Sequence, residues 1–491
     1  MMNTPTATDF IIFGALGDLS QRKLLPSLYD LEKDQLIPPG SRIICLARQA
    51  SQTDTFRQTT ATSLEIHVAE DRFNPQTLQS LLGRISYIQL DFSQSDQYHQ
   101  LELQLNATTS QQRIFYYATA AEFFGSISQY LSQYNCIDSG SRVVLEKPLG
   151  FDRESSAQIN EEVSQYFTEQ QTYRIDHYLG KETVQNLLAL RFANPIFGTQ
   201  WNQNYISHIE ITIAESVGIE GRWSYFDKAG QMRDMVQNHL LQLLALVAMD
   251  PPDDLSADSI RDQKVKVLKQ LKQITLAEQK DSVVCAQYDS GNNDTELLPG
   301  YNSEAGAQGD SDTETFVAIK AEISSWRWAG VPFYLRTGKR MKQKVTQIIV
   351  HFKQQPHFIF DPQQRNLASN KLILSLQPNE GVSLQVQTKS PGINNDIQIQ
   401  PTILDLNFNQ EFSGVRTPHA YERLLLEVIK GNQSLFVRRD EIEHAWAWCD
   451  NLMQHWDSSE HTLHKSPAGS WGPTESAMIM RKDNRQWFGE N

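Results

Sequence analysis

Short apolar strands alternate with amphipathic helical stretches in the first third of the chain. Continuous apolar runs predict five strands, at residues 9–13, 42–47, 85–90, 113–118 and 142–148. A helical stretch that runs to about Leu36 separates the first two. Strands spaced by helices are typical of βαβ units, whose strands are parallel. We therefore predict an N-terminal Rossmann-like, doubly wound parallel sheet.

Beyond about residue 200 the apolar positions alternate with polar ones at period two. The clearest examples are the segments 208–213, 316–320, 346–351, 371–375 and 382–386. Such half-buried strands are typical of an antiparallel sheet covered on one face by helices. We expect an α/β domain over 1–176 and a larger domain over 177–491, with a mostly antiparallel sheet. The polar stretch 289–314 is predicted to be a loop.

Composition supports two domains and excludes several classes of partner. At 491 residues the chain exceeds what one hydrophobic core usually supports. A net charge of −14 argues against nucleic acid or an anionic membrane as a partner. Four widely separated cysteines indicate neither a zinc ribbon nor a disulfide framework. Without a signal sequence or an apolar run of about 18 residues, we expect a cytoplasmic protein.

A glycine turn follows the first predicted strand and opens a helix, with the sequence GALGDL at 14–19. This context aims backbone N–H groups at a pyrophosphate, although the spacing is not GxGxxG and an ordinary βα turn is the alternative. The second strand ends at Arg48 and Gln49, where an NAD-selective fold usually carries an acid. Arg48 can instead pair with a 2′-phosphate. NADP is therefore the predicted cofactor, with NAD as a weaker alternative.

The run RIDHYLGKE at 174–182 concentrates polar chemistry near the predicted domain boundary, where two-domain enzymes often bind ligands. His177 and Lys181 are four residues apart and are expected to share a helix face. With Tyr178 beside them, they suit a phosphate group. The alternative is a solvated helix start with Asp176 as its N-cap.

Lys147 belongs to the segment Glu146-Lys147-Pro148, which closes a later strand of the parallel sheet. The carboxyl ends of such strands border the ligand crevice, so Lys147 is predicted to lie between cofactor and substrate. The alternative is a surface lysine that precedes a turn proline.

His239 lies in a mostly apolar segment, 234–247, that predicts a buried helix. A hydrogen-bonded core histidine and a general base are both compatible with that position, and the base would need a carboxylate to orient its ring. Spacing leaves three candidates open for that carboxylate: Asp176, Glu215 and Asp234. By period two, Glu215 lies on the inner face of its strand and needs a partner.

Seven segments, in order, resemble glucose-6-phosphate dehydrogenases over essentially the whole chain. They are the segments at 14–19, 146–148, 174–182, 234–239, 331–340, 421–426 and 469–473. The resemblance implies an NADP-dependent oxidoreductase that converts D-glucose 6-phosphate into 6-phospho-D-glucono-1,5-lactone by oxidation at C1. This is the first step of the oxidative pentose phosphate pathway of glucose metabolism. The family also implies a homodimer or homotetramer joined through the large sheet domain.

The resemblance assigns roles to particular residues of this sequence. It makes His239 the general base and Asp176 the carboxylate that orients it. It assigns the substrate to His177, Tyr178, Lys181 and, less closely, Lys344 at the phosphate, and to Lys147, Glu215, Asp234 and Lys339 at the sugar. It assigns the cofactor to Gly14, Ala15, Leu16, Gly17, Asp18, Leu19, Arg48, Gln49 and Lys147, and no metal ligands are implied.

The chain departs from the family at Ala121, where a proline usually precedes the Phe-Phe-Gly segment. We expect no cis peptide there, because a non-proline cis bond costs about 2.5–4 kcal/mol, so the loop near the nicotinamide is expected to differ in shape. Two other functions are compatible with the fold. A Rossmann dehydrogenase of an unphosphorylated sugar is disfavoured by His177 and Lys181. A non-catalytic dinucleotide sensor is disfavoured by the presence of His239 and Asp176.

Overall fold

The computed structural model describes residues 6–107, 112–293, 296–360, 369–391, 397–411, 414, 416–454, 456 and 462–490. The chain forms two compact units. The first unit comprises Met1–Glu182, Pro252–Arg261 and Thr417–Glu443, and the second comprises Thr183–Pro251, Asp262–Arg416 and His444–Asn491. This differs from the expected division at 176/177, because the first unit extends to Glu182 and two later segments return to it.

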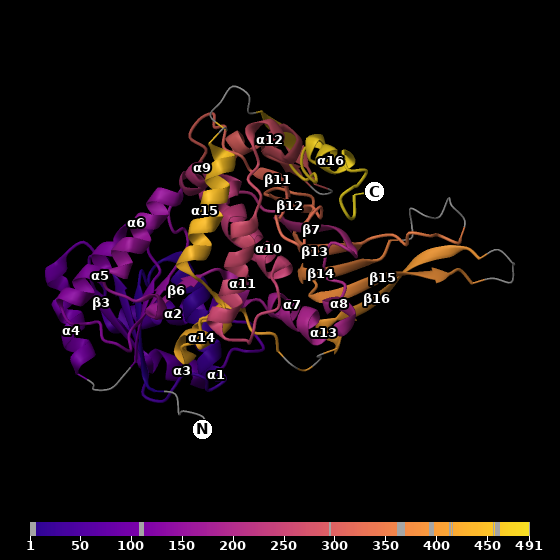
Figure 1. Ribbon diagram of the computed structural model, residues 1–491. Helices are drawn as coiled ribbons and strands as arrows, with labels where there is room; N and C mark the ends of the chain where they lie inside the picture. The colour runs from indigo at the N-terminus through magenta and orange to yellow at the C-terminus, as the bar shows by residue number, and fades with distance from the viewer. Residues whose placement is uncertain are drawn as a thin grey trace. The chain divides into compact units, whose positions relative to one another are not determined.

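A seven-stranded sheet forms the centre of the first unit (Figure 1), in the order β17-β6-β5-β4-β1-β2-β3. All neighbouring strands are parallel except the short β17, which pairs antiparallel with β6. The strands are β1 Thr8–Phe13, β2 Arg42–Ala47, β3 Ile85–Gln89, β4 Gln112–Tyr117, β5 Arg142–Leu145, β6 Thr172–Ile175 and β17 Phe436–Val437. The predicted Rossmann-like parallel sheet is confirmed, and β17 explains why a late segment joins this unit.

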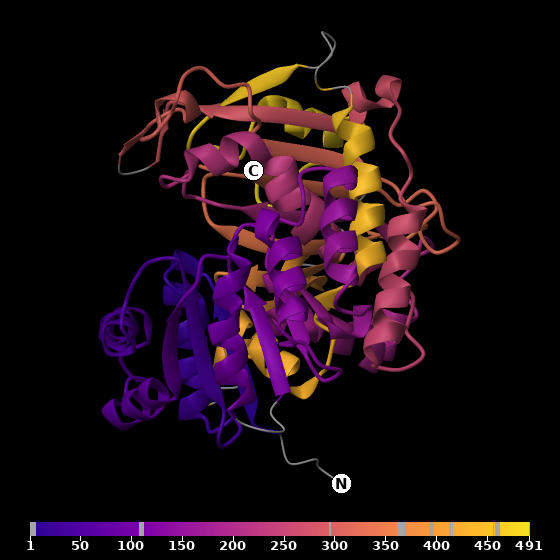
Figure 2. The same ribbon diagram turned by 90° about the vertical axis from the view of Figure 1, so that its left-hand side faces the viewer.

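Helices pack on both faces of this sheet (Figure 2), each face with its own apolar cluster. One face carries η1 Ser20–Leu24, α1 Leu25–Lys33, α2 Thr53–His67, α3 Pro75–Arg84 and α14 Ala420–Lys430. The other carries α4 Tyr98–Asn106, α5 Phe124–Gln133 and α6 Arg153–Ser164. Short helices are η2 Ser95–Gln97, η3 Ala121–Phe123, η4 Glu169–Gln171 and η5 His177–Gly180. The helix expected to reach Leu36 ends at Lys33.

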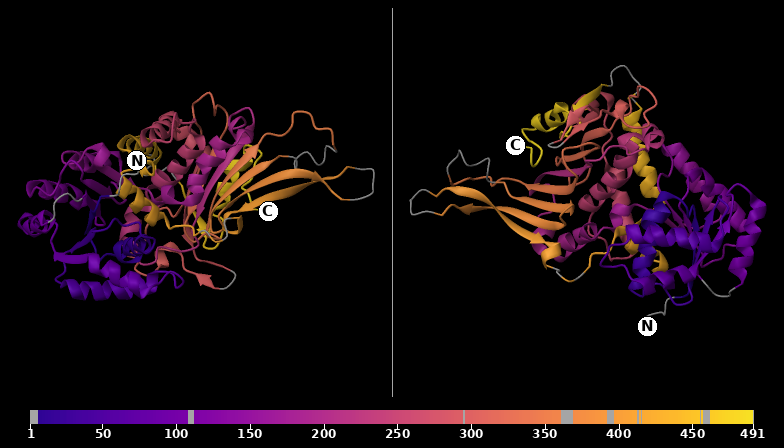
Figure 3. Two further views of the ribbon diagram at one scale, coloured as in Figure 1. Left: turned by 90° about the horizontal axis from the view of Figure 1, so that it is seen from below. Right: turned by 180° about the vertical axis from the view of Figure 1, so that it is seen from behind.

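A nine-stranded sheet forms the second unit, in the order β16-β15-β14-β13-β7-β12-β11-β8-β18. Its pairs are antiparallel except β7–β12 and β8–β18. Its long strands β15 and β16 pair side by side, as Figure 3 shows. The strands are β7 Ile206–Ala214, β8 Val283–Asp289, β11 Phe316–Ala321, β12 Phe333–Gly338, β13 Val345–Phe352, β14 Lys371–Gln377, β15 Gly381–Lys389, β16 Ile399–Asn407 and β18 Leu463–Pro467. The predicted mostly antiparallel sheet is confirmed.

Helices of the second unit cover its sheet and connect its strands. They are α8 Pro195–Gly198, α9 Trp223–Gln231, η6 Met232–Leu240, α10 Leu241–Ala248, α12 Leu276–Ser282, α13 Phe408–Glu411 and α16 Thr474–Arg481. Three further helices contain residues of both units: α7 Glu182–Ala193, α11 Ala257–Gln270 and α15 Arg439–Met453. No helix in the described part of the chain has the length and apolar character that a bilayer crossing requires.

The stretch 289–314 is more ordered than the predicted loop. Its described residues contain the paired strands β9 Gly291–Asn292 and β10 Leu297–Leu298, followed by the single turn η7 Tyr301–Ser303. The physical reason is a set of apolar side chains within the polar stretch. Leu298 and Tyr301 are buried in one cluster with Trp223, which holds this segment against α9.

Candidate active site

The glycine turn of the first unit joins β1 to η1 at the centre of the parallel sheet. Gly14 has a φ of +90°, and a Cβ at that position would lie 2.2 Å from the carbonyl oxygen of Ala118. On the other side, the Gly14 N–H donates to the carbonyl of Leu46 at 2.9 Å. The turn is thus held between the carboxyl ends of β4 and β2. In a doubly wound sheet this is the switch point at which dinucleotides bind.

Backbone groups of this turn divide into buried and exposed ones. Ala15 is fully buried and its N–H donates to Leu46 at 3.1 Å, so Ala15 shapes the turn. Gly17 and Asp18 are exposed, and the Gly17 N–H donates to the Gly14 carbonyl at 2.9 Å. The helical backbone that starts here offers the partial positive charge of a helix N-terminus, which favours an anion.

Arg48 and Gln49 follow β2 directly, as predicted, and both are exposed. Their backbone is held by residues of β3, because the Gln89 side-chain amide donates to the Arg48 carbonyl at 3.3 Å. The hydroxyl of Tyr87 likewise donates to the Gln49 carbonyl. These contacts present the Arg48 side chain at the carboxyl end of β2.

Glu146 and Lys147 follow β5, and Glu146 is held in a buried network. Its carboxylate accepts from the Tyr116 hydroxyl at 2.5 Å and also from that of Tyr421 in α14. Burial raises the pKa of Glu146, whereas these hydrogen bonds and the charge of Lys147 lower it. The half-buried Lys147 is therefore anchored through its neighbour at the carboxyl edge of the sheet. Sequence reasoning did not find the role of Tyr116.

Two residues of the run 174–182 have structural roles. Arg174 is buried in β6, where it donates to both Glu169 carboxylate oxygens at 2.6 and 3.0 Å and to Asn160 at 2.7 Å. Gly180 packs against α14 so closely that a Cβ would lie 2.7 Å from the carbonyl of Ala420. These two residues explain part of the unusual composition of the run.

The expected α-helical face for His177 and Lys181 is wrong. His177–Gly180 form the single 3₁₀ turn η5, and Lys181 has an extended backbone with φ −74° and ψ 138°. Packing of Gly180 against α14 and the bond from Lys181 N–H to the Tyr178 carbonyl, 3.1 Å long, end the helix there. Asp176 is indeed the N-cap, since its Oδ1 accepts from the Tyr178 N–H at 3.0 Å.

The three predicted phosphate-binding side chains nevertheless lie close together. The Lys181 ammonium is 3.7 Å from the centroid of the Tyr178 ring, a cation–π distance. The His177 and Tyr178 ring centroids are 4.9 Å apart. His177 also lies parallel to Tyr421 of α14, with centroids 6.4 Å apart. The cluster unites one ammonium, one imidazole and one phenol.

Asp234 and His239 of the second unit lie on η6, which is a π-helix rather than the expected α-helix. Asp234 and His239 are five residues apart. In an α-helix, at about 100° per residue, they would point about 140° apart, but i→i+5 bonding turns them toward the same side. His239 is completely buried and Asp234 nearly so. Neither fact distinguishes a core histidine from a general base.

Lys339, Glu215 and Asp234 form an ionic cluster in this unit. The Lys339 Nζ lies 2.7 Å from the Glu215 carboxylate and 3.6 Å from that of Asp234. Glu215 and Lys339 meet because they directly follow β7 and β12, which are parallel neighbours with Ala214 opposite Gly338. This is the partner that the position of Glu215 required. Lys344 is exposed in the turn before β13.

Glu314 is a buried carboxylate that sequence reasoning missed. Its Oε1 accepts from the Met232 N–H at 2.9 Å, at the first residue of η6. Gly230 makes room for it, because a Cβ there would lie 2.4 Å from the same oxygen. Burial raises the pKa of Glu314 to about 7. Glu314 thus fixes the start of the helix that carries Asp234 and His239.

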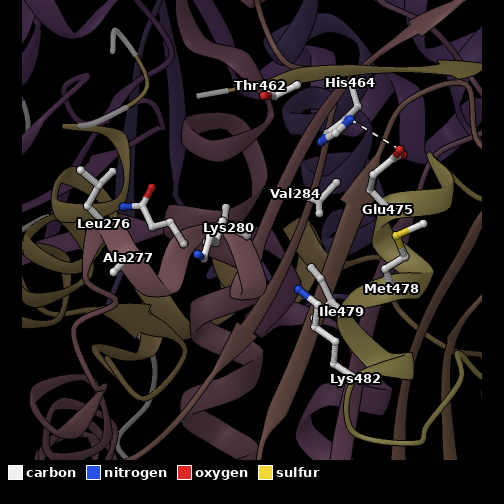
Figure 4. A pocket seen from close by; sticks show the side chains of 12 residues that line it. Leu276, Ala277, Lys280, Val284, Thr462, His464, Glu475, Met478, Ile479 and Lys482 are labelled. Carbon is white, nitrogen blue, oxygen red and sulfur yellow. Dashed lines mark ion pairs between the residues drawn. The ribbon is translucent and has the colours of Figure 1, made fainter. Parts of the chain in front are cut away.

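A separate cavity of about 580 Å³ lies between α12, β8, β18 and α16 of the second unit (Figure 4). Its wall includes an ion pair between His464 and Glu475, 3.8 Å apart. The residues that line it in the described structure include none of those predicted for the active site.

Comparison with known proteins decides the family. Residues 11–186 match the model for the NAD binding domain of glucose-6-phosphate dehydrogenase, and residues 188–488 match the model for its C-terminal domain. The chain belongs to the glucose-6-phosphate dehydrogenase family. The match confirms the predicted family and enzyme class, and it indicates a dinucleotide cofactor.

Individual members of the glucose-6-phosphate dehydrogenase family align along nearly their entire length. The enzyme of Dickeya dadantii is 47% identical over 488 residues, covering 99% of this chain and 98% of that protein. The enzyme of Rhizobium meliloti is 43% identical, covering 98% and 97%. A solved glucose-6-phosphate dehydrogenase in complex with its substrate glucose-6-phosphate has a TM-score of 0.90 and 30% identity, covering 99% of this chain and 100% of that chain.

Proposed function

We propose that this chain oxidises D-glucose 6-phosphate at C1 to 6-phospho-D-glucono-1,5-lactone, with NADP as the preferred hydride acceptor. The observation that supports this most strongly is the full-length similarity to the substrate-bound dehydrogenase, at 30% identity and a TM-score of 0.90. The predicted residues are present in this chain, and each unit groups its own share of them. The dinucleotide turn and the Lys181 cluster belong to the first unit, and the Lys339 cluster and His239 to the second.

His239 acts as the general base in this proposal. A secondary alcohol releases hydride from carbon readily only when its hydroxyl proton is removed at about the same time. A neutral imidazole accepts a proton near pH 7, and general-base catalysis contributes roughly 10²–10⁴-fold. Asp176 keeps the role that the resemblance implies, a carboxylate that orients the base. NADP supplies the nicotinamide that accepts the hydride when it is bound.

The phosphate is bound by His177, Tyr178 and Lys181, and this group supplies orientation rather than chemistry. Binding energy from a part of the substrate remote from C1 holds the reacting carbon in position. The close packing of Lys181 on Tyr178, 3.7 Å from the ring centroid, supports a preformed cationic site. Lys339 with Glu215 and Asp234 can hydrogen-bond sugar hydroxyls through both donors and acceptors.

Arg48 supports a preference for NADP over NAD. It is exposed at the carboxyl end of β2, the position that meets the adenosine ribose in doubly wound sheets. A guanidinium pairs bidentately with a phosphate, whereas an acid there would repel it. NAD is the weaker alternative. It is not excluded, because the adjacent Gln49 is neutral.

A homodimer or homotetramer is proposed on the basis of the second sheet. The edge strand β16 exposes large apolar side chains at Ile403, Leu404 and Leu406. An exposed apolar edge strand is avoided in isolated proteins, so a second copy that covers it is the simplest arrangement. The cytoplasmic location predicted from the sequence stays a prediction.

Initial-rate kinetics with NADP and NAD, each with glucose, glucose 6-phosphate and galactose 6-phosphate, test the function directly. We expect a large advantage for glucose 6-phosphate with NADP. Faster turnover of free glucose would favour the alternative, a dehydrogenase of unphosphorylated sugars. No reduction of either nucleotide would favour a non-catalytic dinucleotide sensor.

Lys181→Ala tests the phosphate-binding role. Removing the ammonium should raise KM for glucose 6-phosphate by about tenfold or more, equivalent to roughly 1.4 kcal/mol, with a smaller change in kcat. Activity on free glucose should be nearly unchanged. Equal losses on both sugars would contradict the assignment. Lys33→Ala, at the end of α1, is a control for the loss of a lysine elsewhere in the first unit.

A further inference from the structure

Two histidines and a glutamate meet on one face of the nine-stranded sheet, on strands that also lead toward the active-site residues. His208 on β7 lies directly opposite His351 on β13 in the antiparallel register. Glu210 is two residues beyond His208 on β7, so it projects from the same face. All three side chains are buried, and none of them has a role in the proposed reaction.

The three side chains direct one polar atom each toward a common point. Glu210 Oε1 is 2.6 Å from His351 Nε2 and 3.8 Å from His208 Nε2. Together the three atoms lie within 4.8 Å of one another. Among the described residues, none of these three atoms has a hydrogen-bond partner with acceptable geometry. Buried polar atoms without such a partner are rare and require an explanation.

Two other polar atoms, one on His208 and one on Glu210, are held by neighbouring groups. His208 Nδ1 lies 3.1 Å from the Ser207 hydroxyl, and Glu210 Oε2 accepts from the Phe488 N–H at 2.9 Å. Metal-binding histidines and carboxylates have the same arrangement, in which a second hydrogen bond fixes the orientation of the ligand. Here those bonds orient His208 and Glu210 so that their inner atoms lie around one point with His351 Nε2.

Size and chemistry restrict that ligand to a small cation. Zinc binds imidazole nitrogen and carboxylate oxygen at about 2.0–2.2 Å, so its ligand atoms lie roughly 3.3 Å apart in a tetrahedron. The observed separations of 2.6 and 3.8 Å lie on either side of that value. The imidazoles are stacked, with centroids 3.9 Å apart, which keeps the two rings side by side at the site.

The ligand types favour a transition metal over Mg²⁺. Two of the three side chains are imidazoles, whereas Mg²⁺ prefers oxygen ligands. Imidazole and carboxylate ligands suit zinc and its neighbours in the first transition row.

We propose that His208, Glu210 and His351 form a structural binding site for a divalent first-row transition metal ion, of which zinc fits best. An ion bound there links β7 to β13 directly. It also holds the C-terminal segment on the sheet through the bond from Phe488 to Glu210. The expected effect is therefore on stability rather than on the hydride-transfer step.

Zinc titration of the full-length, chelator-stripped protein tests the proposal. After gel filtration, elemental analysis should find about one zinc ion per chain, and Tm should rise with zinc concentration. His208→Gln and His351→Gln should each abolish both effects. His99→Gln is the matched control, because it removes a histidine that faces a glutamate, Glu102, at the surface. His239→Asn, which removes another buried histidine of the second unit, should keep the zinc.

Retention of zinc in both glutamine variants, or no retention by the wild-type protein, would overturn the proposal. If a variant fails to fold, X-ray absorption of the zinc-loaded wild-type protein still tests the site, because it identifies the metal ligands directly. Two imidazoles with additional oxygen ligands are expected around the metal. A coordination shell of oxygen alone, or one that contains sulfur, would contradict the site.

Discussion

The glycine turn of the first unit and the η6 region of the second unit, which belong to the proposed cofactor and substrate sites, are built by opposite means. At residues 14–19 the backbone is decisive, since Gly14 has a positive φ and a Cβ there would lie 2.2 Å from the carbonyl oxygen of Ala118. In the η6 region side chains are decisive, since Lys339 lies between two carboxylates and Glu314 holds the first turn of the helix. We expect an added atom to disturb the first region and a change of charge to disturb the second.

The difference determines which perturbation reports on each region. A backbone site should respond to an added methyl group and hardly to pH. A site built from buried charges should respond to isosteric changes that alter charge or basicity, and to pH.

His239→Asn should produce the largest loss. The amide preserves much of the size of the imidazole but cannot accept a proton near neutral pH. We expect kcat to fall about 10²–10⁴-fold, with KM for glucose 6-phosphate nearly unchanged. Steady-state kinetics measure both. A kcat close to that of the wild type would show that His239 is a core histidine, which its complete burial alone would permit.

Glu314→Gln should change how stability depends on pH. Burial raises the pKa of Glu314 from 4.5 to about 7, so the native state favours the protonated form. Its contribution is complete below the unfolded pKa and is lost as pH rises through the folded pKa, over roughly pH 4.5 to 7. The shift corresponds to an order of magnitude of about 3 kcal/mol. The neutral amide retains the acceptor for Met232 and should remove this part of the pH dependence.

Denaturant unfolding of the wild-type protein and Glu314→Gln at pH 5 and pH 8 measures this effect. The variant should lose less stability than the wild type between the two values. Glu278→Gln is the control, because hydrogen bonds from Thr275 lower the pKa of this exposed carboxylate to about 2, below the tested range. Parallel pH curves for the wild type and Glu314→Gln would contradict the raised pKa.

Sequence patterns were sufficient to locate residues that lie in a backbone turn or at the end of a strand. The glycine turn was located from its position after a strand. Glu215 was correctly expected to need a partner. That partner was not identified, because the pairing of β7 with β12 joins segments more than 100 residues apart. Periodicity reports which residues share an element, but it does not report which elements are neighbours.

The helices gave the clearest differences between prediction and structure. Apolar spacing cannot distinguish an α-helix from the π-helix η6, since both place residues four apart on a similar face. Nor did it find the 3₁₀ turn at His177, which depends on the close approach of Gly180 to α14. The role of Glu314 could not be predicted from sequence patterns, because its partner, Met232, is 82 residues away. Tertiary packing decided each of these cases.

Gly14→Ala tests the backbone side of the comparison. A methyl group would meet the Ala118 carbonyl at 2.2 Å, and the positive φ adds strain of about 1–3 kcal/mol. We expect the turn to shift and NADP affinity to fall about tenfold or more, measured by fluorescence titration. Gly83→Ala is the control, since its added Cβ in α3 meets nothing within 4 Å. Unchanged NADP affinity would show that the turn does not bind the cofactor.

Arg48→Gln should produce the smallest effect, because Arg48 adds one charged side chain to a site that the backbone has already formed. Losing its contact with the 2′-phosphate should raise KM for NADP about tenfold, equivalent to roughly 1.4 kcal/mol, and leave KM for NAD almost unchanged. The ratio of the kcat/KM values for NADP and NAD measures this change in nucleotide selectivity. Arg57→Gln, on α2 of the same unit, should leave the ratio unaltered. If the KM values for NADP and NAD rise equally, Arg48 contributes to the shape of the turn after β2 rather than to recognition of the phosphate. A rise for NADP alone would instead show that one charged side chain selects the nucleotide while the backbone turn binds both.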